Sequence, residues 1–144
     1  MRDNDWLEAK LDYMIKKHFP DVNFKNPVFI HFGRCARTRL GSIKKVYPKS
    51  LVAKLKGNFS SVITMNGHFR DENIPEYNID AVIAHELCHY AHGFSSPLPQ
   101  MTTHPHRGGI VDKEMVKRGF GDTLKKQKKW FKENWISYLK TNNP

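Results

Sequence analysis

The string His85-Glu86-Leu87-Cys88-His89 carries residue types and a spacing that suit metal-assisted hydrolysis. Because residues i and i+4 lie one above the other on one face of an α-helix, both imidazoles can reach the same metal ion. Glu86 lies about 100° around that helix, where its carboxylate can take a proton from water without ligating the metal. A zinc ion lowers the pKa of its water toward roughly 7. The motif therefore predicts zinc-dependent peptide-bond hydrolysis, with Glu86 as the general base.

A catalytic zinc uses three protein ligands and keeps one position open, so a third ligand must come from another part of the chain. The downstream candidates are His92, His104, His106 and Glu114. His92 lies on the same helical stripe as the motif histidines. However, the seven residues from His85 to His92 rise about 10.5 Å along a helix, which is too far for one tetrahedral ion. On spacing alone, the two loop histidines and Glu114 stay open as the third ligand.

The element that must carry the motif is a helix that opens at Asn78-Ile79-Asp80 and closes at a glycine cap, Gly93. Cys88 is expected to be a small core residue of this helix rather than a ligand. The segment from Phe94 to Gly109 contains prolines, glycines and His104 and His106, so we expect a long loop there. Such a loop can bring a histidine back to the helix.

The rest of the sequence predicts an α+β fold, zincin-like, with an N-terminal helix, a small mostly antiparallel sheet, the motif helix and C-terminal helices. An apolar stripe ending at Pro20 predicts the first helix, capped by Asn4 or Asp5. Expected strands are 27–32, 38–47 and 60–66, with a loop at 51–59. Asp112 and Asp122 are expected to begin the last two helices. No linker is evident, so we expect one domain over 1–144, with a core at 27–120 and a C-terminal helix at 122–140.

The charge is high and unevenly distributed. Lys and Arg number 24 against 14 Asp and Glu, a net charge of +10. No acidic residue occurs from Val22 through Arg70, and a second basic block runs from Lys125 to Lys132. Segregated positive charge is typical of a protein with a polyanion partner, and DNA is the partner we expect.

Cysteine content and hydropathy indicate an intracellular protein. Two cysteines, Cys35 and Cys88, cannot form a disulfide framework and suit a reducing compartment. No stretch approaches the ~18 apolar residues of a membrane span, and the first residues lack the apolar core of a secretory signal. We therefore expect a monomer in the cytoplasm, or in the nucleus of a eukaryote, with protein substrates, DNA and no membrane partner.

Four features together resemble the SprT-like (Spartan-type) zinc metalloproteases. They are the run Leu40-Gly41-Ser42-Ile43, the strand ending at Asn66, the helix from Ile79 to His89, and a histidine–glycine segment that leads into a helix. The resemblance covers roughly 27–120. It implies that His85, His89 and His106 bind one catalytic zinc and that Glu86 is the base. In the family glycine usually follows the late histidine directly, whereas here Arg107 intervenes.

The resemblance also implies a substrate class: proteins held on or crosslinked to DNA, as in DNA–protein crosslink repair. No cysteine follows Cys88, so the family's C-terminal zinc ribbon has no counterpart in this sequence, and DNA binding would use the basic surface. We expect the strand at 61–66 to line the cleft and pair with substrate. Tyr90, His68 and His92 are all candidates to support the oxyanion.

Two alternatives stay open at this point. The first is a gluzincin-like cytosolic peptidase, with Glu114 as the third ligand. The second is a DNA-binding protein whose zinc is structural, held by four histidines: His85, His89, His104 and His106. Glu86 argues against the structural site, which has no use for a carboxylate beside the motif.

Overall fold

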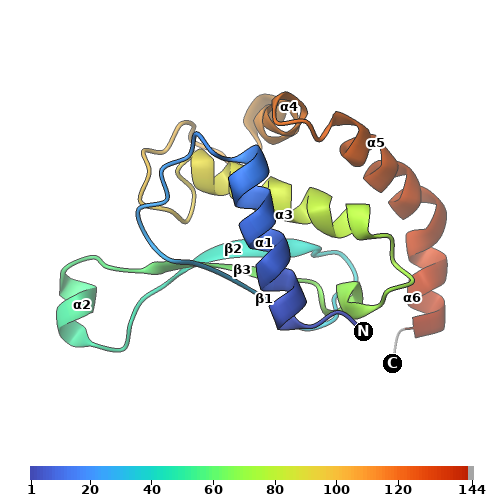
Figure 1. The fold of residues 1–144 in the computed structure, drawn as a ribbon, viewed down its shortest axis with the longest axis horizontal. Helices are drawn as coiled ribbons and strands as arrows, with labels where there is room; N and C mark the ends of the chain where they lie inside the picture. Colours follow the sequence, from blue (N-terminus) through green and yellow to red (C-terminus); the bar gives the residue numbers. More distant parts are fainter. Residues whose placement is uncertain (143–144) are drawn as a thin grey trace.

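The computed structural model describes residues 1–142 and has an α+β fold, with a small sheet on one side and helices on the other (Figure 1). In chain order the elements are α1 (Asn4–His18), β1 (Val28–Phe32), β2 (Gly41–Val46), α2 (Leu51–Leu55), β3 (Ser60–Met65), the 3₁₀ turn η1 (Gly67–Arg70), α3 (Glu76–Ala91), the 3₁₀ turn η2 (Arg107–Gly109), α4 (Ile110–Lys117), α5 (Gly121–Trp130), the π-helical segment η3 (Phe131–Trp135) and α6 (Ile136–Asn142). No helix among these is long and apolar enough to cross a membrane.

The sheet is mixed, which corrects the expected mostly antiparallel arrangement. Its strand order is β1-β3-β2, with β1 and β3 parallel and β2 and β3 antiparallel. The connection after β1 carries the chain past the place of β3 to form β2. The chain then returns as β3 between the two earlier strands. The central strand is therefore β3, and β2 is an edge strand.

Burial alternates along the strands, so one face of the sheet belongs to the core. Ile30 pairs with Ile63 and Phe32 with Met65, and all four side chains are buried. Phe29 and His31, which alternate with Ile30 and Phe32 in β1, are exposed. This period of two places the apolar side chains on one face, and α3 lies along one side of the sheet in Figure 1.

Helix α3 is the centre of the fold. It is enclosed by the sheet, α1, α4 and α5, and most of its residues are buried. The helix begins at Glu76, two residues before the expected start, and ends as expected before a glycine. Gly93 has φ +85°, and a Cβ there would overlap the carbonyl of Pro99. The chain thus leaves α3 through a left-handed turn that favours glycine.

Several expected boundaries shift in the structure. Asp3, rather than Asn4 or Asp5, caps α1, because its carboxylate accepts from the backbone N–H of Trp6 at 2.8 Å. The expected loop at 51–59 contains α2, whose first turn is capped by Ser50. The final helix starts at 121 rather than 122 and continues through η3 to Asn142.

The C-terminal helical segment is joined by two long-range hydrogen bonds to the β1–β2 connection and to the residue that follows η1. The indole N–H of Trp135 donates to the carbonyl of Arg37 at 2.8 Å. The hydroxyl of Tyr138 donates to the carboxylate of Asp71, also at 2.8 Å. These bonds set α5 and η3 beside α3, where they form one wall of the candidate site.

Candidate metal centre

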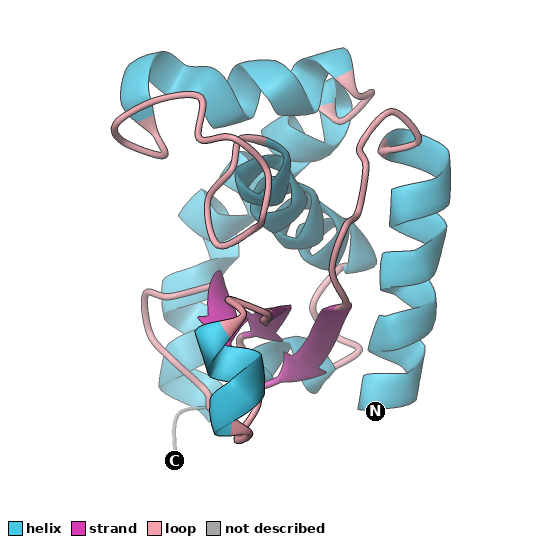
Figure 2. Cartoon of the chain, turned by 90° about the vertical axis from the view of Figure 1, so that its left-hand side faces the viewer, coloured by secondary structure: helices cyan, strands magenta, loops and turns pink. Residues whose placement is uncertain are grey.

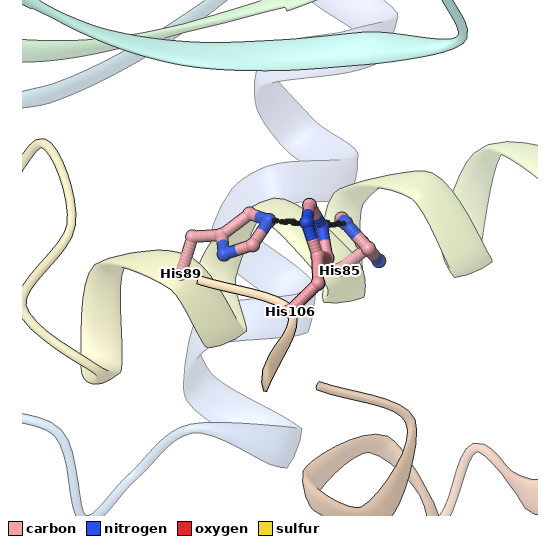
Figure 3. Close-up of side chains that lie close together, drawn as sticks. All are labelled: His85, His89 and His106. Atoms are coloured by element: carbon pink, nitrogen blue, oxygen red, sulfur yellow. Dashed lines mark hydrogen bonds between the residues drawn. The ribbon is translucent and has the colours of Figure 1, made fainter. Parts of the chain in front are cut away.

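Three imidazoles from two segments converge at the surface of α3 (Figure 3). His85 and His89 lie one turn apart on α3, and their Nε2 atoms are 3.0 Å apart. His106 comes from the loop before η2. Its Nε2 atom lies 3.1 Å from that of His85 and 3.1 Å from that of His89. The three side chains form a cluster that could hold a metal ion.

The arrangement of these nitrogens suits a cation better than it suits hydrogen bonding. Each neutral imidazole nitrogen has either one proton or one lone pair, so three that face one another cannot all be satisfied by mutual hydrogen bonds. A cation between them accepts all three lone pairs at once. The Nδ1 atom of His89 is buried without a hydrogen-bond partner, so the remaining ring nitrogen of that histidine is not braced by a protein group.

Electrostatics keep two of the three rings in the ligating, neutral form. Burial, with the neighbouring His106, lowers the pKa of His85 to about 4. Burial, with His85 and His106 next in size, lowers the pKa of His89 to about 3. Both imidazoles are therefore neutral at pH 7 with lone pairs available, as metal ligation requires.

Two hydrogen bonds hold the loop that carries His106, one to the end of α3 and one within the loop. The N–H of Met101 donates to the carbonyl of His92 at 2.9 Å, and the hydroxyl of Thr102 donates to the carbonyl of His104 at 2.7 Å. Directly after His106, Gly108 and Gly109 adopt φ values of +65° and +69°. Two successive left-handed residues turn the chain sharply into α4 and leave the histidine beside α3.

Glu86 lies next to the cluster but takes no part in it. Its side chain is 5% exposed, and burial raises its pKa to about 7. Gly41 of β2 lies above it. A Cβ at that position would stand 2.6 Å from Cγ1 of Val82 and 3.5 Å from Oε1 of Glu86. Glycine therefore lets the edge strand approach α3 closely, directly over the carboxylate.

Two cavities meet at Gly41, His85 and Glu86. One, of about 460 Å³, is lined by these residues and by Thr38, Arg39, Leu40, Val82, Asp112, Met115, Leu124, Gln127, Lys128 and Phe131. The other, of about 350 Å³, is lined by them and by Ser42, Ile43, His89, Phe94, Ser95, Pro105 and His106. Residues at the start of β2 contribute to both, so the edge strand runs past the histidine cluster from one cavity to the other.

The other candidate ligands lie elsewhere. His92 is buried, and its Nε2 atom lies 3.3 Å from a carboxylate oxygen of Glu114. The second oxygen of Glu114 accepts from Nε of Arg118 at 3.0 Å, so this carboxylate has two partners of its own. His104 is exposed and is not a member of the cluster found within the described residues.

None of the three oxyanion candidates lines either cavity. Tyr90 is buried and donates its hydroxyl to the side-chain oxygen of Asn26. His68 packs edge-on against Trp135 and Tyr138 near the opposite end of α3. The expectation that β3 pairs with substrate is also wrong, because β1 and β2 occupy both of its edges.

Sequence reasoning missed the wall of the larger cavity. Leu124 and Phe131 line it, and Asp112 forms an ion pair with Lys128 at 3.2 Å, but no motif in the sequence predicts these contacts. The signal was weak, because these residues belong to α4, α5 and η3 and meet only through tertiary packing. Cys88 is the expected core residue, fully buried, with its pKa raised by burial to about 12.

Comparisons of the chain with family models, curated proteins and solved structures gave no match, so what the site can do follows from its own residues.

Proposed function

We propose that this protein is a zinc-dependent endopeptidase of the SprT-like type, acting on proteins that are held on or crosslinked to DNA. The observation that carries the proposal is the convergence of His85, His89 and His106 beside the buried carboxylate of Glu86, at the meeting point of two cavities. The family assignment rests on the motifs described above, and the activity rests on this geometry.

The donor set fits zinc. Zinc binds imidazole nitrogens at about 2.0–2.1 Å, which separates tetrahedral ligands by about 3.3 Å. The nitrogens of the cluster are 3.0–3.1 Å apart, so small movements of the rings bring them to that spacing. Three imidazole ligands and no fourth within the described cluster suit a catalytic site, which keeps one position open.

When bound, zinc would polarise the scissile carbonyl and make a neighbouring water more acidic. Glu86 supplies the base. It lies on the same helix as two of the ligands, one residue after His85, so its carboxylate faces the space beside the cluster without joining it. Because it is nearly buried, it can accept the proton from the attacking water in a poorly solvated site and later pass it to the departing amine.

The edge strand β2 would hold the substrate. Its outer edge carries backbone N–H and C=O groups that no strand of the sheet uses, and an extended peptide can pair with such an edge. One of these groups, the carbonyl of Ile43, accepts from the hydroxyl of Ser95 at 3.1 Å, a bond that a peptide would replace. A peptide aligned there crosses the histidine cluster at Gly41. Its side chains on either side of the scissile bond would enter the two cavities, the larger of which has apolar walls from Val82, Leu124 and Phe131.

The basic surface supports a DNA-associated substrate. Arg34, Arg39 and Lys44 line a third cavity, of about 250 Å³, which also reaches Gly41 and therefore adjoins the substrate edge. Phosphate groups bound at these cations would bring a DNA-held protein close to the cluster. This charge is independent of the metal centre, so DNA binding and catalysis can be tested separately.

Cleavage by matched glutamate variants tests the proposal. Wild type, Glu86→Gln and Glu8→Gln would be loaded with zinc and given an unfolded protein and a DNA-bound protein, with and without DNA. Glu8 is exposed on α1 and serves as the control. We expect Glu8→Gln to match wild type. Glu86→Gln should keep its zinc and lose about 10²–10⁴ in rate, the contribution of general acid–base catalysis.

Two results would contradict the proposal. Equal cleavage by wild type and Glu86→Gln would mean that another mechanism or a contaminating protease is responsible. If none of the three proteins cleaves and four protein ligands hold the zinc, the protein is not this enzyme and its zinc is structural. If DNA does not stimulate cleavage, the proposed peptidase activity stands, but the proposed class of DNA-associated substrates is wrong.

A further inference from the structure

Residues 44–59 form an arm that extends from the sheet away from the rest of the fold. It consists of the end of β2, the short helix α2 and the segments that connect α2 to β2 and β3, and α2 forms its tip (Figure 1). Figure 2, turned by 90°, shows α2 nearest the viewer, in front of the strands. None of the residues of α2 is buried. The tip therefore has no role in the core.

The tip nevertheless carries large aliphatic side chains. Leu51, Val52 and Leu55 are 71%, 61% and 79% exposed, and Val46 and Tyr47 behind them are 49% and 45% exposed. Single exposed apolar residues are ordinary on protein surfaces, but a contiguous group on one projecting element marks a contact surface. Tyr47 packs on Phe59 across the arm, with ring centroids 5.7 Å apart, so an aromatic pair lies behind the aliphatic tip.

The arm is also strongly positive. It carries the cations Lys44, Lys45, Lys49, Lys54 and Lys56. The nearest acidic residues in the sequence are Asp21 and Asp71, because no acidic residue occurs from 22 through 70. Three of the lysines alternate with or flank the aliphatic residues of α2. Charge complementarity therefore demands an occupant that is anionic and also offers an apolar interior.

An anionic bilayer meets both demands. The tip is convex, and a bilayer accepts a convex apolar element without a preformed socket. Aliphatic side chains enter the boundary between headgroups and acyl chains, aromatic rings favour the headgroup level, and lysines favour anionic headgroups. The arm carries all three groups: the aliphatic residues on α2, the aromatic pair behind them, and lysines at both levels. Nucleic acids instead favour aromatic platforms and arginine for stacking, and α2 has neither: the aromatic pair lies behind it, with the two rings packed against each other.

We propose that the arm docks this protein onto anionic phospholipid surfaces, with Leu51, Val52 and Leu55 inserted below the headgroups and the five lysines among them. The sequence expectation of no membrane partner rested on the absence of a spanning stretch, which peripheral docking does not need. The proposal does not depend on the metal centre, because the arm contributes no residue to the histidine cluster or to the two cavities beside it. Only Lys44 of the arm also lines the third cavity, and the residues changed in the test below lie outside β2.

Co-sedimentation of the full chain with vesicles tests this surface. The probes are vesicles of phosphatidylcholine alone and vesicles of phosphatidylcholine with about 30% phosphatidylserine. We expect binding to the anionic vesicles only. Leu51→Ser with Leu55→Ser should weaken it at least about tenfold through lost apolar insertion. Lys54→Ala with Lys56→Ala should weaken it about 25-fold, because each lysine near an anionic surface contributes about fivefold.

Matched controls change the same chemistry outside the arm. Val116→Ser with Ile136→Ser removes two apolar side chains that are 57% and 53% exposed, and Lys16→Ala with Lys17→Ala removes two exposed cations of α1. Neither control should change vesicle binding. Zinc content and circular dichroism, expected to be unchanged in every variant, show that the fold is intact.

Three outcomes would overturn the proposal. The first is wild-type protein that fails to bind anionic vesicles or binds both kinds equally. The second is tip variants that bind vesicles like wild type but lose binding to single-stranded DNA, which would assign the arm to nucleic acid. The third is a wild-type dimer in sedimentation velocity that the leucine variant abolishes, which would assign the tip to a second copy of the chain.

Discussion

Removal of His106 should separate this metal site from the alternatives built on the same motif. His85 and His89 are preset by one helix, whereas His106 reaches them from a loop through the turn at Gly108 and Gly109. The His106 side chain is exposed, so His106→Ala should leave the hydrophobic core intact. Its effect on stability should therefore appear only when zinc is present.

The size of that effect can be worked out from binding linkage. Free zinc at 100 times its dissociation constant stabilises the folded protein by about 2.7 kcal/mol. For 144 residues the entropy of unfolding is about 0.3 kcal/mol/K, so zinc should raise Tm by about 9 °C. Loss of a group that merely supports a ligand costs 10–100-fold in affinity, so we take about 100-fold as the least cost of losing a ligand itself. The stabilisation then falls to about 0.4 kcal/mol, and the rise in Tm falls to about 1 °C.

The assay is thermal unfolding with and without a fixed free zinc concentration, for wild type and for His106→Ala, His104→Ala and Glu114→Ala. We expect the zinc-dependent rise to be lost only in His106→Ala. The reasoning is refuted if His106→Ala keeps the full rise. A rise lost in Glu114→Ala but kept in His106→Ala would favour the gluzincin-like ligand set.

Three further predictions concern the edge strand, the fold and the charge. Gly41→Val should lower kcat/KM at least about tenfold and leave the zinc content unchanged. The Cβ of the new valine would stand 2.6 Å from a side-chain carbon of Val82, so the edge strand would be displaced. Unchanged kinetics would exclude this edge as the substrate site. The Arg118 guanidinium, hydrogen-bonded to Asp21, lowers the pKa of that carboxyl from 3.8, so the pair stabilises the fold above that pH and loses its effect as pH falls through the lowered value. Urea unfolding at pH 7 and pH 3 should show a smaller loss on acidification for Asp21→Asn than for wild type. The affinity for duplex DNA should fall by about 0.9 log unit per log unit of salt for each phosphate contact. Binding that does not depend on salt would show that the protein does not hold DNA through its phosphates.

The parts of the fold that the sequence predicts well are those governed by local periodicity. The stripe of α1, the alternation in β3 and the i, i+4 histidines of α3 each follow from the geometry of one element. Strand order does not, because it depends on where the segment between β1 and β2 carries the chain. That is why β3 was wrongly expected to meet the substrate and the sheet to be mostly antiparallel.

The candidate site divides in the same way. The motif pair was evident from spacing, and the placement of His106 beside it required the braced loop and its two left-handed glycines. Spacing alone leaves Glu114 open as an alternative to His106, but in the fold it lies with His92 and Arg118. The helix α2 was missed because five residues with no buried side chain leave no core-facing pattern. Its exposure, which local rules do not anticipate, is the feature that suggests a contact surface.

Zinc-edge X-ray absorption of the metal-loaded protein tests the central claim most directly, because it counts the atoms bound to the metal and distinguishes imidazole ligands. We predict one zinc per chain with three imidazole nitrogens at about 2.0–2.1 Å and one position that no protein atom fills. His106→Ala should show only two imidazoles. Four protein ligands, or zinc bound without His85 and His89, would contradict the account of an open catalytic centre.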